Sequence, residues 1–524
     1  MSFDDDPRRH ALDSQRVPPS AIAAIAASHP DRPFAVDVGG RTLSYGQFHH
    51  ELRQWCAYLR GIGVNAGERI VSMLPNSIDA HLLWLASCCV GAVEVAVNRD
   101  LRGELLRHIL TDSGARRCFV RPEDRQTPFL SGVSGLEVIE VPRERPLVAA
   151  YAPAAELARP APADVCTVIY TSGTTGPAKG VMVTWAQLAT AIGRIPRDWL
   201  SDQDAFYSPW PMFHLTGRTP MITMLDVGGR FVCRERPSVS QFWTDIDRYG
   251  CTVATVSPIA KLLLAEPEQA TDRDHPLRVI HLAGEPAVAF ERRFGARPVT
   301  SYGSSELGFP VIKRQARPDW LSVTGWLRPG YQLRIVDEHD VDVPVGGAGE
   351  LWIKPPAREL LMRGYLGDEA SGRSGRSRAG RQPIVDGWYR TGDRFSQRPD
   401  GALCFLDRMG DTIRRFGENI SAKAIEDIIG AEPGIAECVV LGVPSEIAGQ
   451  ELLLAIEARR GVVVEPAALF DRLARLLPKH TLPAFVVVLD RLPKTPNGKL
   501  AREAVRAAIA HAERWRSPAA VSNH

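Results

Sequence analysis

Apolar residues recur along most of the chain with two periods, one typical of helices and the other of strands. Phe48, Leu52 and Trp55 stand three or four positions apart, which predicts a helix over residues 45–59 that ends at Gly61 and Gly63. A second helix is expected over residues 79–90. Strands are expected over residues 69–74, 165–170, 251–256 and 278–282. This alternation predicts an α/β fold with mostly parallel sheets and packed helices, whose binding loops follow the carboxyl ends of the strands.

The pattern changes after about Asp407. Ser421 can cap a helix with a single apolar face, formed by Ala424, Ile425, Ile428 and Ile429. Further strands are expected over residues 438–441, 452–456 and 485–489, with a helix near residues 467–477 between them. These elements predict a small, separate α+β domain. Before it, the Gly-, Ser- and Arg-rich residues 367–383 are interpreted as a solvated, mobile loop, with a basic docking site as the alternative.

Length, charge and cysteine use narrow the class of protein. The chain has 524 residues, more than one hydrophobic core usually supports, so at least two domains are expected. Its 63 basic and 61 acidic residues give a net charge of +2, which argues against a nucleic-acid partner unless a local basic patch is hidden in the neutral total. Nine scattered cysteines without paired spacing indicate reduced, buried thiols in a cytoplasmic protein and no zinc site.

Neither a signal peptide nor a membrane span is expected. The first twenty residues are polar and acidic, unlike a secretory leader. The longest apolar run, Leu82 to Val93, is too short to cross a bilayer, and we interpret it as a buried helix that leads into a strand.

The segment YTSGTTGPAKG, residues 170–180, has the composition of an anion-binding loop. Glycines let the backbone approach a phosphate, and successive N–H groups and hydroxyls can surround its oxygens, with Lys179 as an added point charge. We expect a strand before the loop and a helix that begins near Thr184. An ordinary Gly/Thr-rich turn is the alternative.

Two better-known loop types do not fit this segment. A Walker A loop needs Gly-Lys-Ser/Thr, whereas Lys179 lies between Ala178 and Gly180. A nucleophile elbow needs G-x-S-x-G, and neither Ser172 nor Ser305 has glycines at both offsets. The segment is therefore a phosphate-loop candidate of another kind.

Together with six further motifs, the loop resembles the superfamily of adenylate-forming enzymes, which includes acyl-CoA synthetases, peptide-synthetase adenylation domains and luciferases. The six motifs follow in the family's order over nearly the whole chain: PMFH at 211–214, GEP at 284–286, YGSSE at 302–306, YRTGD at 389–393, Asp407-Arg408 with GENI at 417–420, and PKTPNGK at 493–499. The resemblance implies ATP, Mg²⁺ and coenzyme A as cofactors and a carboxylic acid as substrate.

The resemblance also assigns roles to residues of these motifs. Glu306 would coordinate magnesium, a surface acid being the alternative interpretation, and Tyr302 would stack on adenine opposite Gly284, Glu285 and Pro286. Asp393 would accept hydrogen bonds from both ribose hydroxyls, and Arg408 would support the same nucleotide. The remaining nucleotide-binding residues implied are Thr171, Ser172, Gly173, Thr174, Thr175, Gly176, Lys179, Gly303, Ser304 and Ser305.

The small domain is implied to act twice. Lys499 would bridge the attacking carboxylate and the α-phosphate, and after a rotation Gly417 would line the route of the thiol. His214 would gate that route, although it can equally be a packing residue. We predict a large domain over residues 1–409 and a mobile one over residues 411–524, with a hinge near Gly410. Glycine at the hinge, Ala178 in the phosphate loop and Phe416 beside Gly417 depart from the usual family pattern.

The expected activity is that of an ATP-dependent acyl-CoA ligase with Lys499, His214, Glu306 and Thr171 as catalytic residues. A stand-alone enzyme that loads a carrier-protein thiol, an enzyme of one half-reaction and a silent nucleotide-binding relative are the alternatives. Arg218 would meet a polar or acidic group of the acid or else point outward at the surface. The candidate pocket for the acid is formed by Phe213, His214, Gly217, Arg218, Ala283, Tyr302, Gly303, Gly308 and Phe309.

Overall fold

Two mostly parallel sheets carry the larger part of the chain. The computed structural model describes residues 17–127, 130, 133–143, 147–171, 178–257, 259–282, 285–314, 318–320, 322–337, 339–367, 383–408, 412–493, 500, 502–510 and 512–518. The first sheet has the strand order β15-β14-β13-β12-β11-β9-β10-β1-β2. Its strands are β1 (Pro33–Asp37), β2 (Thr42–Ser44), β9 (Ala205–Ser208), β10 (Arg230–Cys233), β11 (Val253–Thr255), β12 (Val279–His281), β13 (Arg297–Ser304), β14 (Gly308–Lys313) and β15 (Trp326–Leu327).

The second sheet has the order β6-β5-β3-β4-β7-β8, with β8 antiparallel at one edge. Its strands are β3 (Arg69–Ser72), β4 (Val93–Ala96), β5 (Arg117–Val120), β6 (Glu137–Glu140), β7 (Val165–Thr171) and β8 (Lys179–Thr184). The large domain's helices are α1 (Pro18–Ser28), α2 (Tyr45–Gly61), α3 (Ile78–Cys89), α4 (Gly103–Ser113), α5 (Trp185–Leu188), α6 (Leu215–Val227), α7 (Val239–Arg248), α8 (Ala260–Ala265) and α9 (Glu285–Phe294).

Helix α3 lies in the core between the two sheets. All twelve of its residues are buried, as expected for a helix that is covered on every side. It contacts β1 of the first sheet and β3, β4 and β7 of the second. Strands of both sheets therefore pack against the same helix. In such folds the binding loops follow the carboxyl ends of parallel strands, and the candidate site follows the ends of β7 and β13.

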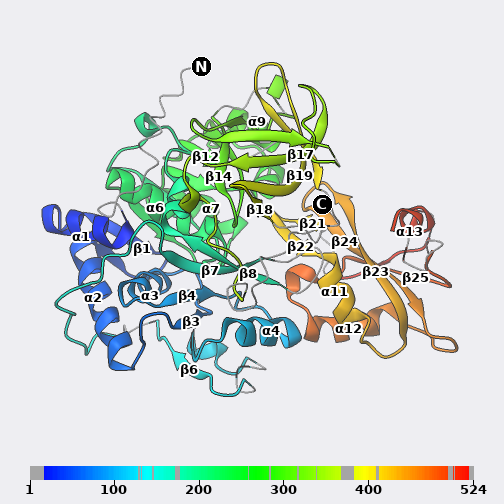
Figure 1. The fold of residues 1–524 in the computed structure, drawn as a ribbon, viewed down its shortest axis with the longest axis horizontal. Helices are drawn as coiled ribbons and strands as arrows, with labels where there is room; N and C mark the ends of the chain where they lie inside the picture. Colours follow the sequence, from blue (N-terminus) through cyan, green and yellow to red (C-terminus); the bar gives the residue numbers. More distant parts are fainter. Residues whose placement is uncertain are drawn as a thin grey trace.

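A third, antiparallel sheet follows, of β16 (Gln332–Val336), β17 (Ala348–Lys354), β18 (Ile384–Val385), β19 (Trp388–Gln397) and β20 (Leu403–Arg408). The last part of the chain forms its own sheet and its own core, drawn in orange and red at the right of Figure 1. Its elements are β21 (Thr412–Arg415), β22 (Glu418–Ser421), α11 (Ala422–Ile429), β23 (Ile435–Ser445), β24 (Gly449–Ala458), α12 (Pro466–Leu476), β25 (Phe485–Leu489), α13 (Arg502–Ile509) and β26 (Trp515–Arg516).

The predicted α/β class with a smaller α+β C-terminal domain is confirmed. Helix α2 begins after Ser44, which forms a capping box with Gln47, and β25 spans the predicted residues 485–489. All nine cysteines are buried and free, as expected. In the described part of the chain, no helix is long and apolar enough to cross a membrane. Gly410, residues 368–382 and Lys499 lie outside the described residues, so the domain boundary, the hinge and the mobile loop stay predictions.

Candidate functional site

The phosphate-loop candidate joins two antiparallel strands. Thr171 at the end of β7 pairs with Lys179 at the start of β8, so the two ends of the loop lie side by side. The expectation of a helix that begins near Thr184 is confirmed, because β8 ends at Thr184 and the Thr184 side chain caps α5. Residues 172–177, which include the predicted Ser172, Gly173, Thr174, Thr175 and Gly176, lie outside the described residues.

Glu306 lies close to this loop, linked to it by Tyr365. The carboxylate of Glu306 is buried and accepts a hydrogen bond from the Tyr365 hydroxyl at 3.2 Å. The ammonium of Lys179 is 5.2 Å from the centroid of the Tyr365 ring. The structure therefore brings the predicted metal-binding acid and the predicted phosphate-binding lysine together. Tyr365 was not predicted from the sequence, because it is 59 positions from Glu306 and has no local motif of its own.

Glu306 can supply one ligand to a magnesium ion whose other ligands come mainly from phosphate oxygens and water. Among the described residues there is no group of three histidine, cysteine or acidic side chains that could hold a metal by itself. Mg²⁺ commonly uses one or two carboxylates and completes its shell with phosphate oxygens and water. A single buried acid beside a phosphate loop suits that chemistry.

Tyr302 and Asp393 meet where the first and third sheets adjoin. The Tyr302 hydroxyl donates to Asp393 Oδ2 at 2.7 Å, and the Tyr302 ring packs edge-on against Phe395. Asp393 pairs across β19 and β20 with Arg408, whose side chain is not among those described. Three residues predicted to bind one nucleoside are thus brought together from three strands. Of the predicted facing wall, Gly284 is outside the described residues, and Glu285 and Pro286 open α9.

Glycine is required at Gly303 for steric reasons. A Cβ atom there would lie 1.7 Å from the carbonyl oxygen of Gly308 on the neighbouring strand β14. Ser304 Oγ accepts a hydrogen bond from the backbone N–H of Glu306, and the carbonyl of Ser305 accepts one from Gln187 at 2.6 Å. These contacts fix the turn that presents Glu306.

The C-terminal domain reaches the large domain at His214. His214 stands before α6, and its Nε2 is 3.6 Å from Glu418 Oε1, while His480 Nε2 is 3.3 Å from Glu418 Oε2. Burial alone would raise the pKa of Glu418. The close contact with His214 and the positive charge of protonated His480, His214 and Arg415 outweigh burial and lower the pKa of Glu418 to about 2. Glu418 is therefore an ionised bridge between the two domains, and neither it nor His480 was a predicted site residue.

The contact of Glu418 with His214 holds Gly417, the glycine predicted to line the route of the thiol, against the large domain. Phe416 and Gly417 form the two-residue turn between β21 and β22, with φ of 49° and 82°. Positive φ at both positions is typical of a type I′ hairpin turn, in which asparagine or glycine is favoured and phenylalanine is costly. Gly417 immediately precedes Glu418 and so lies close to His214.

Arg218 neither meets the substrate nor points outward. It is fully buried in α6 and pairs with the equally buried Glu94 of β4 at 2.6 Å. Its Nε donates to the Met212 carbonyl, and its guanidinium carbon lies 4.4 Å from the centroid of the Trp84 ring. Both interpretations of Arg218 were wrong, because the counter-charge is 124 positions away on another element.

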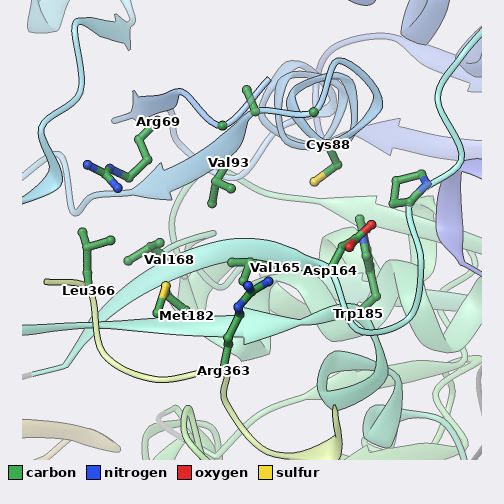
Figure 2. Close-up of a pocket in the computed structure, with 14 residues that line it drawn as sticks. Arg69, Cys88, Val93, Asp164, Val165, Val168, Met182, Trp185, Arg363 and Leu366 are labelled. Carbon is green, nitrogen blue, oxygen red and sulfur yellow. The ribbon is translucent and has the colours of Figure 1, made fainter. Parts of the chain in front are cut away.

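A separate cavity of about 390 Å³ lies on the other face of the β7–β8 hairpin (Figure 2). Val168, Met182 and Leu366 line it and belong with the core under that face. Tyr365 packs in the opposite core with Val181. The hairpin thus separates this cavity from the Glu306 site.

The family follows from comparison with known proteins. A model described as AMP-binding enzyme matches residues 22–366, and one described as AMP-binding enzyme C-terminal domain matches residues 424–499. The chain belongs to the AMP-binding enzyme family. This AMP-binding enzyme is an adenylate-forming ligase, in agreement with the resemblance seen in the motifs.

Named relatives agree with this placement. The AMP-binding enzyme is 28% identical to the crotonobetaine/carnitine–CoA ligase of Salmonella typhi over 497 residues, 88% of this chain and 93% of that one. Its fold is similar to that of the amide bond synthetase McbA from Marinactinospora thermotolerans, with a TM-score of 0.81, 23% identity and coverage of 95% and 99%. It is also similar to o-succinylbenzoate CoA synthetase from Bacillus subtilis, with a TM-score of 0.80, 23% identity and coverage of 93% and 98%.

Proposed function

We propose that the protein is an ATP-dependent acyl-CoA ligase. An oxygen of the acid's carboxylate would attack the α-phosphorus of ATP, and pyrophosphate would leave with the cleaved P–O bond. The thiol of coenzyme A would then attack the acyl carbon, lose its proton and displace AMP. The contact of Glu418 with His214 carries the proposal, because it brings the turn at Gly417, implied to line the thiol route, against the large domain.

The first step needs positive charge around a polyanion. Lys179 and the N–H groups of residues 171–176 would bind phosphate oxygens, and Asp393 would hold the ribose. Magnesium held by Glu306 and the phosphates would neutralise charge as pyrophosphate departs. Lys499 would supply the charge between the two reacting anions.

Pyrophosphate release tests the proposal. We would incubate the protein with ATP, magnesium and a panel of carboxylic acids, each with and without coenzyme A. Release that rises with coenzyme A, together with a new acyl-CoA, is the expected result. Acid-dependent release that ignores coenzyme A, but rises with an amine or a carrier-protein thiol, would contradict the choice of acceptor. No release with any acid, and no acyl-CoA from supplied acyl-adenylates, would contradict the ligase function itself.

Replacing Glu418 with glutamine should slow only the second half-reaction. The carboxylate bridges two histidines across the domain contact, and each partner is about a third exposed. A polar contact of this exposure contributes about 1 kcal/mol, which corresponds to a roughly fivefold fall in acyl transfer. Acyl-CoA formation from a supplied acyl-adenylate measures that step, and pyrophosphate release in the absence of coenzyme A measures the first.

The matched control is Glu446→Gln, which changes an exposed acid of the same domain. It should alter neither step. Equal losses of both steps in Glu418→Gln would mean that Glu418 stabilises the protein generally and does not hold the thiol-transfer arrangement.

A further inference from the structure

Arg194 is a buried cation without a counter-charge. It follows the short 3₁₀ turn at Ala189–Ala191 and is only 3% exposed. Its Nε donates to the Ala191 carbonyl at 3.2 Å, and its guanidinium carbon lies 4.4 Å over the ring of Phe309. Among the described residues, no carboxylate pairs with it, and its Nη atoms have no hydrogen-bond acceptor.

The other buried arginines among the described residues are neutralised or held by several acceptors. Arg121 pairs with Asp79 at 3.0 Å, Arg218 with Glu94, and Arg415 with Glu451 at 2.8 Å. Arg328, beside Arg194, donates to the carbonyls of Thr190, Phe309 and Ile192. An unpaired buried charge is costly, so Arg194 differs from its neighbours in needing an external partner.

The position of Arg194 points to the acid pocket. Phe309, over which it lies, belongs to the predicted pocket and follows the turn that presents Glu306. Gly308 lies so close to Thr190 that a Cβ atom would be 2.5 Å from its hydroxyl, which packs the 3₁₀ turn against β14. The same region receives the carboxyl ends of parallel strands β12 and β13.

His281 and Ser301 supply further polar groups beside Arg194. His281 Nε2 and Ser301 Oγ are 2.8 Å apart. Burial, helped by the positive charge of Arg194, lowers the pKa of His281 to about 3. The imidazole is therefore neutral at physiological pH, and Arg194 is the positive charge of this group.

We propose that Arg194 binds a second anionic group of the acyl substrate, remote from the carboxylate that is activated. The inference rests on the proposed ligase function and names its substrate class: acids with a second carboxylate or an equivalent anion at the far end. Guanidinium offers planar, paired N–H donors that match a carboxylate, and Phe309 covers one face of it. Carnitine and crotonobetaine carry a quaternary ammonium group, so we expect this chain to discriminate against them.

Matched pairs of acids test the inference without any mutation. Straight-chain dicarboxylic acids of increasing length are each compared with their monoamide of the same length, by pyrophosphate release. We expect kcat/KM for the best dicarboxylic acid to exceed that of its monoamide roughly a hundredfold, mainly through KM. Equal values for the two members of every pair, or a preference for the amides or for carnitine, would overturn the inference while leaving the ligase function intact.

Substitution of Arg194 locates the effect. Arg194→Gln should abolish the preference, with the dicarboxylic acid falling to the level of the amide and the amide unchanged, whereas Arg194→Lys should keep part of it. Arg197→Gln, which changes a half-exposed arginine three positions on, is the control and should leave both acids unaffected. Equal losses for both acids in Arg194→Gln would assign Arg194 a structural role. No pyrophosphate release with any acid in the native protein would instead contradict the proposed function.

Discussion

Replacing Lys499 with alanine is expected to lower acid-dependent pyrophosphate release about a hundredfold to a thousandfold. Two anions, the carboxylate and the triphosphate, must approach each other in this step, and one preorganised positive group at such a centre contributes about 3–4 kcal/mol. Acyl transfer from a supplied acyl-adenylate to coenzyme A should survive, because the α-phosphate is then already joined to the acid. The two half-reactions must therefore be measured separately.

The control for Lys499 is Lys479→Ala, an exposed lysine of the same domain. It should retain both half-reactions. If Lys499→Ala lost both equally and its melting temperature fell as well, the lysine would be structural. If neither step changed, the role implied by the PKTPNGK motif would be wrong for this chain.

Removal of the Glu94 carboxylate should destabilise the protein strongly. Glu94 and Arg218 are both fully buried, and Glu94 also accepts a hydrogen bond from Thr167 at 3.0 Å. In Glu94→Ala the guanidinium would remain buried without its partner, at a cost of about 3–5 kcal/mol. Chemical denaturation followed by tryptophan fluorescence measures this loss, and Trp84, stacked against Arg218, reports on the site.

Two further variants separate the loss of the Glu94–Arg218 ion pair from a general effect of substitution on stability. Glu104→Ala breaks an exposed pair with Arg107 on α4 and should cost less than about 1 kcal/mol. The double variant Glu94→Leu/Arg218→Met should regain much of the stability lost in Glu94→Ala, because both buried charges are then gone. A double variant as unstable as Glu94→Ala would mean that packing, and not the orphaned charge, causes the loss.

Local sequence patterns predicted the helices, strands and motifs that depend on residues close together in the chain. The spacing of Phe48, Leu52 and Trp55 located α2, and the branched run at residues 485–489 located β25. The motifs identified Tyr302, Asp393 and Glu306, which the fold brings to one region. Each of these motifs is short and contiguous, so it could be recognised from the sequence alone.

Contacts between distant segments could not be predicted in this way. Tyr365 bonds to Glu306, Glu418 bridges His214 and His480, and Arg218 pairs with Glu94, all across separations that carry no periodic signal. Arg218 was misinterpreted for the same reason, because whether a side chain is buried depends on which distant segments pack against it. The helix expected near Thr184 was predicted correctly. The strand β8 before it was not predicted, because its residues 179–184 are held as a strand by their pairing with β7.

The nine buried cysteines have a consequence for an enzyme that handles activated acids. A thiolate, not a thiol, attacks an acyl-adenylate, and burial raises the pKa of Cys88, Cys118, Cys166, Cys233, Cys251 and Cys404 above the usual value. The protein's own sulfur is thereby protected from self-acylation during turnover. Thiol-specific dyes should consequently leave the native protein unlabelled, so the consumption of an added thiol acceptor can be followed directly in its presence.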